Sequence, residues 1–315
     1  MRAGILLGMM FLLASIQSSI AQESSSWREN EIDPSTWDDG PTLEGSPMDA
    51  PREGDALILL NLSYVPGHGD SRVEGEVVVE LFEEWAPLTT TNIIEHVESG
   101  LYDGIFFHRV IDDFVTQSGD PTCETVGIYP GTNPSCGSGG TGETIPLELD
   151  ENLSHVDGAI GMARSTDPDS ADSQWYICDG EQHGLDPENR DDEGYATFGV
   201  VRDGMSHIRA IASTPTSDEP TGSPLQNPFS TAGRPVYEVH INSATMLGVV
   251  GLNESSNESA GNDVVSIQTD DDDSLITTYT MFGFAIGISL ALVIISTRVE
   301  EPKELVEDAE IISEH

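Results

Sequence analysis

The chain has 315 residues, of which 56 are acidic and 12 are basic, so its formal net charge is −44. This charge excludes nucleic acid as a default partner and disfavours anionic lipid headgroups, because both need clusters of Lys and Arg. Hydrophobic residues make up 37% of the chain, below the usual share for globular domains. Part of the chain is therefore expected to lie outside a packed core, and the length allows one or two domains.

The N-terminus has the pattern of a secretory signal peptide. A basic start is followed by an apolar run over residues 5–14 and by small residues ending at Ala21, which predicts a signal peptide over residues 1–21. A buried N-terminal helix is the alternative, and the charged start disfavours it. Residues 22–54 are rich in Ser, Glu, Asp, Pro and Gly without apolar periodicity, which predicts a disordered acidic lead-in.

Residues 55–247 have the pattern of one folded domain, built mainly from strands. Two helices are expected, over residues 89–99 and 204–212, because apolar residues recur there at helical spacing. Many short strands with two helices suggest a closed β-barrel. The expected strands are short apolar runs separated by Gly, Pro and Asp, at residues 57–65, 76–82, 105–110, 159–163, 174–178, 196–201 and 236–246.

The C-terminal part changes composition twice. Residues 248–274 are acidic and polar, which predicts a flexible stalk. Residues 275–297 carry no charge and are long enough to cross a bilayer, which predicts one transmembrane helix. The basic residues Arg298 and Lys303 follow it, so residues 298–315 are expected to form a short cytoplasmic tail. These features predict a single-pass protein of the cell membrane whose folded domain is extracytoplasmic.

Residues 106–122 read F-F-H-R-V-I-D-D-F-V-T-Q-S-G-D-P-T. This block resembles the F-H-R-V-I-x-x-F-M-x-Q-G-G-D-P-T signature of cyclophilins, the peptidyl-prolyl cis–trans isomerases. The spacing from residues 162–164 to residues 173–174 is most similar to prokaryotic members. Further blocks in family order are residues 139–142, 158–163, 173–177 and 195–201. The resemblance implies a closed eight-stranded antiparallel β-barrel capped by two α-helices, acting on X–Pro polypeptides without a metal or other cofactor.

The chemistry of proline isomerisation explains which residues matter. Rotation about an X–Pro amide is slow because the nitrogen lone pair is conjugated with the carbonyl. A catalyst must therefore bind the twisted amide better than the planar forms, which needs a fixed donor and an apolar slot for the proline ring.

The resemblance assigns these parts to residues of this chain. Arg109 is implied as the donor, with Gln117 as the second catalytic residue that orients it, and Gln174 beside them. Ala163 and Arg164 are implied to offer backbone contacts, and Tyr195 to contact the carbonyl on the proline side. The residues implied to line the proline slot are Phe114, Val115, Tyr176 and Leu185.

Several departures from the family pattern keep a second interpretation open. Val115 replaces the usual methionine of the slot, Ser118 replaces a glycine, and Tyr176 replaces a phenylalanine. A catalytically weak proline-peptide binding or scaffold module is therefore the alternative to an isomerase that assists the folding of exported proteins. A surface adhesion protein that uses the domain as a spacer is a third, weaker interpretation.

Three cysteines are present, and two of them, Cys123 and Cys136, bracket an extra loop directly after the Asp-Pro-Thr block. In an oxidising compartment such a pair is expected to form a disulfide, whereas Cys178 lies in an apolar strand and is expected to stay a free buried thiol. The histidines show no metal-ligand spacing. A monomer is expected, although the sequence does not fix the oligomeric state.

Overall fold

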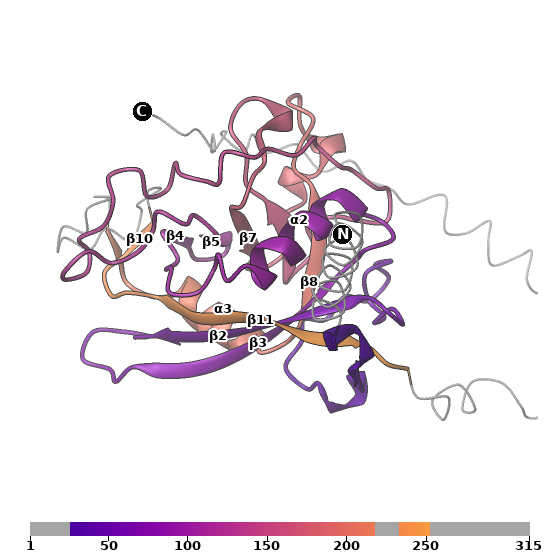
Figure 1. Cartoon of the computed structure of the whole chain (residues 1–315), viewed down its shortest axis with the longest axis horizontal. Helices are drawn as coiled ribbons and strands as arrows, with labels where there is room; N and C mark the ends of the chain where they lie inside the picture. Colours follow the sequence, from indigo (N-terminus) through magenta and orange to yellow (C-terminus); the bar gives the residue numbers. More distant parts are fainter. Residues whose placement is uncertain (1–25, 218–232, 253–315) are drawn as a thin grey trace, which may run out of the picture. The chain divides into compact units, whose positions relative to one another are not determined.

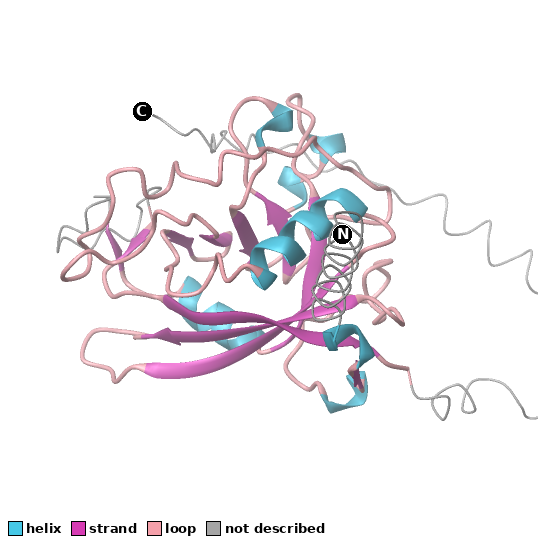
Figure 2. Ribbon diagram, in the orientation of Figure 1, coloured by secondary structure: helices cyan, strands magenta, loops and turns pink. Residues whose placement is uncertain are grey.

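The computed structural model describes residues 26–217 and 233–252, which form a mainly β domain with two α-helices (Figures 1 and 2). The α-helices are α2 (Pro87–Glu98) and α3 (Met205–Ala212). Short 3-10 helices are η1 (Ser26–Glu29), η2 (Pro34–Thr36), η3 (Pro168–Ser170), η4 (His183–Leu185) and η5 (Pro187–Asn189).

The described residues contain one nine-stranded sheet with the order β1-β11-β2-β3-β8-β6-β7-β5-β4. All neighbours pair antiparallel except β1 and β11. The strands are β1 (Glu31–Ile32), β2 (Ala56–Tyr64), β3 (Val73–Leu81), β4 (Arg109–Ile111), β5 (Val115–Ser118), β6 (Ala159–Met162), β7 (Trp175–Cys178), β8 (Thr197–Asp203) and β11 (His240–Val250), and a separate ribbon is formed by β9 (Thr216–Ser217) and β10 (Arg234–Pro235).

The expectation of a closed eight-stranded barrel is wrong. The sheet is open, because β1 and β4 are its two edges and no ladder joins them among the described residues. The segment just before β4 approaches β11 through one isolated bridge, Phe106 to His240. The backbone N–H groups of residues 106–108 donate to the carbonyls of Cys123, Val239 and Gln117, and the Ile105 carbonyl accepts from the N–H of Ile241. Because several different neighbours share this segment, the strand expected at residues 105–110 is reduced to β4.

The expected transmembrane helix is also not part of the observed fold. In the parts of the chain that the structure describes, no helix has the length and apolar character needed to cross a bilayer. The span of residues 275–297 lies outside the described residues, as do the signal peptide, the tail and the stalk beyond residue 252. The stalk was expected to begin at residue 248, but β11 continues to Val250.

Residues 26–54, expected to be disordered, instead pack against the sheet. Strand β1 pairs in parallel with the end of β11. The side chains of Leu43 and Met48 are buried, Met48 completely. The carboxylate of Asp39 accepts hydrogen bonds from the backbone N–H and the hydroxyl of Ser206, and so caps α3. The polar composition hid this order, because two buried side chains and backbone pairing leave no periodic pattern.

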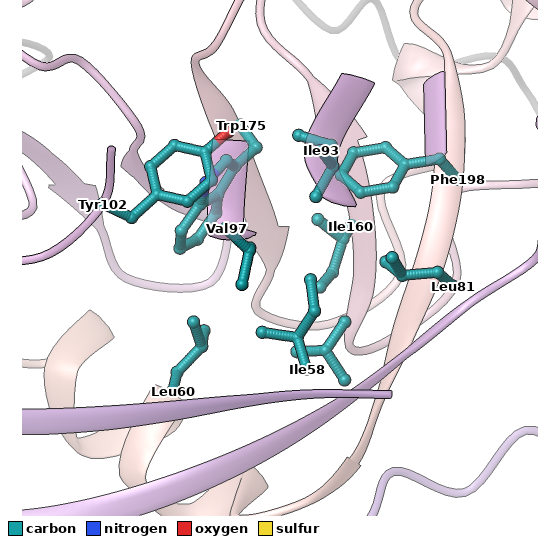
Figure 3. A pocket seen from close by; sticks show the side chains of 10 residues that line it. Ile58, Leu60, Leu81, Ile93, Val97, Tyr102, Ile160, Trp175 and Phe198 are labelled. Atoms are coloured by element: carbon teal, nitrogen blue, oxygen red, sulfur yellow. The ribbon is translucent and has the colours of Figure 1, made fainter. Parts of the chain in front are cut away.

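The core lies between α2 and the long strands, where the apolar face of the helix meets the sheet (Figure 3). Pro87 starts the helix, and the Glu148 carboxylate accepts from the N–H groups of Leu88 and Thr89. Packing leaves one apolar cavity of about 20 Å³ there, which is room for about one water molecule. The cavity is lined by Ile58, Leu60, Val79, Leu81, Ile93, Val97, Tyr102, Ile160, Trp175 and Phe198. It is a packing gap, too small to hold a substrate.

Candidate active site

Three short neighbouring strands bring the predicted catalytic groups together. In the ladder, Arg109 of β4 lies opposite Gln117 of β5, and Gln117 lies opposite Tyr176 of β7. Arg109 Nη1 is 3.5 Å from Gln117 Oε1, and Gln117 Nε2 donates to Gln174 Oε1 at 3.1 Å. These contacts hold the Arg109 guanidinium over the sheet. The strand register explains why the side chains meet, because residues directly opposite in an antiparallel pair share a face.

The environment of Arg109 suits an electrostatic donor. Its side chain is only half-buried, and its guanidinium carbon lies 5.7 Å from the centre of the Phe114 ring. Burial lowers the pKa of Arg109, while the neighbouring Tyr195 raises it. The planar group is thus partly removed from water. In this environment its hydrogen bonds to a twisted amide are stronger than they would be in bulk solvent.

The residues predicted to line the proline slot divide into two groups by exposure. Phe114 is half-buried and lies at the surface, whereas Tyr176, Leu185 and Val115 are only 3%, 4% and 1% exposed. Val115 shares the face of β5 with Gln117, two residues away. The buried three therefore expose little surface, and Phe114 is the accessible member of the predicted set.

Tyr195 is held between two arginines rather than free in a slot. The guanidinium carbons of Arg164 and Arg190 lie 4.5 and 5.2 Å from its ring centre. The Arg164 side chain also donates to the carbonyls of Gly194 and Asp192. The backbone N–H of Ala163, predicted to contact a peptide, already donates to the Gln174 carbonyl. The side chain of Arg164 therefore holds the backbone near Gly194 and Asp192. A hydrogen bond from Ala163 to a peptide would have to use its carbonyl group.

The loop between Cys123 and Cys136, here called the rim loop, leads directly into residues 137–139, which lie next to Gln174. The predicted disulfide is present, with the two sulfurs 2.05 Å apart, and Cys178 is a free buried cysteine. The buried carboxylate of Asp120 accepts from the N–H groups of Gly137 and Gly139. Gln174 Nε2 donates to the Gly139 carbonyl at 2.8 Å. Asp120 thus ties the segment directly after the rim loop to the catalytic face, a role that the sequence alone did not reveal.

His108 precedes Arg109 but does not belong to the catalytic set. It is 6% exposed, and neither ring nitrogen has a hydrogen-bond partner among the described residues. Burial, aided by the positive charges of Arg234 and Arg109, lowers the pKa of His108 to about 3 despite the nearby Asp120. The imidazole is therefore neutral at physiological pH. Within the described ranges, no group of three or more His, Cys, Asp or Glu side chains could hold a metal ion.

Two further residues reach the slot and were missed by sequence reasoning. His155 contacts the Tyr176 hydroxyl, and Gly161 lies under the same ring. The sequence did contain a signal: a tyrosine in an otherwise apolar block needs a polar partner once it is buried. Only the three-dimensional structure shows which residue supplies it.

Comparison with known proteins identifies the family of this chain. Residues 69–246 match the family model of cyclophilin type peptidyl-prolyl cis-trans isomerases. A peptidyl-prolyl cis-trans isomerase of Acinetobacter baylyi is 34% identical over 143 residues, which cover 45% of this chain and 70% of the relative. One of Streptomyces antibioticus is 34% identical over 179 residues, covering 55% and 94%. A solved cyclophilin type isomerase of Cryptosporidium parvum aligns with a TM-score of 0.46 and 21% identity, over 61% of this chain and 97% of that one.

The chain therefore belongs to the cyclophilin type peptidyl-prolyl cis-trans isomerases. Its substrates are polypeptides that contain an X–Pro bond, and its activity is cis–trans isomerisation. Bacterial isomerases are among the relatives at this level of identity.

Proposed function

We propose that this isomerase stabilises the twisted X–Pro amide through Arg109, held by Gln117 and Gln174, and that it acts on exported proteins outside the cytoplasm. The contact chain from Arg109 through Gln117 to Gln174 carries the catalytic part. As the amide twists, its nitrogen regains a lone pair and becomes a better acceptor. A positively charged donor fixed over the slot favours that state over either planar form.

The proposal on location is supported by the disulfide. A bond between Cys123 and Cys136 persists in oxidising compartments and is rare in the cytosol. Proline isomerisation takes tens to hundreds of seconds when uncatalysed, so exported polypeptides that fold after translocation would gain from an isomerase there. This makes unfolded, proline-containing exported chains the client class.

Catalysis is tested by measuring the exchange rate between cis and trans forms of an X–Pro peptide by NMR. The wild-type protein should accelerate exchange, and Arg109→Ala should lose about 10²–10³ of that rate, the typical effect of removing one electrostatic donor. Equal rates for the two proteins would show that Arg109 is misassigned. Binding of the peptide without any acceleration by the wild type would support a binding module.

Location is tested by trapping thiols in intact cells with an alkylating reagent before lysis. Cys123 and Cys136 should escape modification, and Cys178, free but buried, should react only after unfolding. Cys178 is thus an internal control for reagent access. If all three cysteines are alkylated once the trapped protein has been unfolded without a reductant, the compartment is not oxidising.

A further inference from the structure

The hydroxyl of Tyr176 does not lie free in the proline slot. It is 2.8 Å from His155 Nε2, and the two rings stack with an angle of 15° between their planes. Both side chains are buried, His155 completely. The Tyr176 ring is thus held against the buried His155 by a hydrogen bond that a phenylalanine could not make.

Gly161 of β6 makes room for this ring position. A Cβ atom at residue 161 would lie 2.4 Å from the Tyr176 hydroxyl oxygen and 2.5 Å from the ring carbon that carries it. Gly161 also lies directly opposite Tyr176 in the ladder. The glycine and the tyrosine are therefore matched, because any larger residue at 161 would push the ring off His155.

His155 is itself fixed by a carboxylate. Its Nδ1 is 2.6 Å from Asp186 Oδ1, and its backbone N–H donates to the same oxygen at 2.8 Å. An ionised carboxylate has no proton to donate, so Nδ1 carries the proton of that hydrogen bond, and Nε2 is the ring nitrogen that bonds to the Tyr176 hydroxyl. Burial alone would raise the pKa of Asp186, but hydrogen bonds from His155 and His183 outweigh it and keep that pKa below its usual value.

Asp186 directly follows Leu185, another residue of the slot. The Leu185 carbonyl accepts from the backbone N–H of Tyr195, whose ring lies 6.3 Å from that of Tyr176. One buried imidazole therefore connects β7, which carries Tyr176, with η4, which carries Leu185.

We propose that His155 is a positioning residue of the isomerase, which sets the width of the proline slot by holding Tyr176 through its hydroxyl and Leu185 through Asp186. This inference rests on the proposed active site. The slot contacts the proline ring in planar and twisted forms alike, so a change in its width alters binding of both equally. Loosening Tyr176 should therefore raise KM and leave kcat nearly unchanged.

The test uses the full-length protein and an X–Pro peptide, with kcat and KM from NMR exchange measurements. Tyr176→Phe keeps the ring and removes only the hydroxyl. KM should rise about fivefold, as expected for about one net hydrogen bond. His155→Asn should act in the same direction, but it disturbs the buried hydrogen bonds to Asp186, Tyr176 and Thr197 and puts folding at risk, so Tyr176→Phe carries the test.

Gly161→Ala provides an independent route to the same state, because it displaces the ring while both hydrogen-bonding groups remain. Its KM should rise as in Tyr176→Phe, and the double variant should be no worse than the more affected single variant. Effects that multiply in the double variant would show that the two changes act separately, and would overturn the proposal.

Tyr64→Phe is the matched control. The Tyr64 hydroxyl is also buried against a histidine, 3.0 Å from His207 Nδ1, on elements that carry none of the predicted site residues. It should lower the thermal midpoint as Tyr176→Phe does, with KM unchanged. An unchanged KM in Tyr176→Phe, or a fall in kcat alone, would overturn the proposal. Arg109→Ala is measured alongside: if it is as active as the wild type, the active-site assignment itself has failed, whatever Tyr176→Phe shows.

Discussion

The N-terminal segment, residues 26–54, and the rim loop, residues 123–136, are both polar and poor in regular structure, yet they are held in different ways. The N-terminal segment buries Leu43 and Met48, and the buried Arg202 donates to the carbonyls of Asp49 and Ala50. The rim loop leaves Val126 and Ile128 67% and 86% exposed. It is closed by a covalent bond, and its Tyr129 ring packs against the core, on the buried Phe106.

The difference shows how a segment without an apolar face can still be ordered. Where side chains reach the core, hydrophobic burial and buried hydrogen bonds offset the entropy of ordering the backbone. Where few side chains do so, a disulfide adds stability by reducing the entropy of the unfolded chain. The two solutions should therefore respond to different perturbations.

Breaking the anchor of the N-terminal segment should have the largest effect. Arg202 is 7% exposed and pairs with Glu80, which is fully buried. Arg202→Ala leaves that buried carboxylate without its ion-pair partner, with only the backbone N–H of Arg52 still donating to it, and leaves two backbone carbonyls without donors. We expect a loss of about 4 kcal/mol in the free energy of unfolding, as for other broken buried pairs. Urea denaturation of the two proteins measures it.

The control is Arg28→Ala, because Arg28 also ties this segment to the sheet. It pairs with Glu83 at 2.7 Å, but its side chain is 43% exposed. Solvent screens such a pair, so the loss should stay below about 1 kcal/mol. Equal losses in the two variants would contradict the view that buried contacts hold the segment.

Removing the covalent anchor of the rim loop is the second prediction. The bridged cysteines are 13 residues apart, so the double variant Cys123→Ser/Cys136→Ser should lose about 3 kcal/mol, mainly because the unfolded chain is freed. Wild-type protein with a reductant should shift by the same amount, whereas the double variant should not respond to reductant. A reductant-sensitive double variant would place the effect elsewhere.

The sequence predicts the rim better than the N-terminal segment, and the reasons are physical. Two cysteines around a short loop are visible without any structure, and the eight-residue spacing from Arg109 to Gln117 fits a hairpin that brings the two together. The burial of Met48 depends on contacts distant in sequence, such as the N–H of Ser154 at its sulfur. Nothing local in the chain marks such contacts.

The same reasoning explains the errors about the sheet and the site. Strand runs predict which residues are extended, but barrel closure depends on whether the segment before β4 gives its hydrogen bonds to one neighbour or to several. Likewise, the tyrosine at position 176 suggested a polar group in the slot. The position of the Tyr176 ring depends on Gly161 and His155, which lie 15 and 21 residues away in sequence.

The smallest predicted effect concerns Asp55, where the N-terminal segment enters β2. The side chain is 8% exposed, and its Oδ2 has no hydrogen-bond partner among the described residues. Burial, together with the negative charges of Glu80 and Glu83, raises the pKa of Asp55 to about 7, although Arg52 opposes this. The folded state therefore binds a proton here more readily than the unfolded chain does.

The sign of the pH dependence follows from that raised pKa. The favourable contribution of Asp55 is fully present below its unfolded pKa near 4, and it is lost as pH rises through about 7. Asp55→Asn removes the charge, so at pH 8 it should be about 1–2 kcal/mol more stable than the wild type, reduced by the lost attraction to Arg52. The gain should vanish at pH 4. Thermal melts between these values measure it, with the exposed Asp70→Asn as a control without effect. A difference that stays constant across this range would show that the buried charge does not weaken this end of the N-terminal segment.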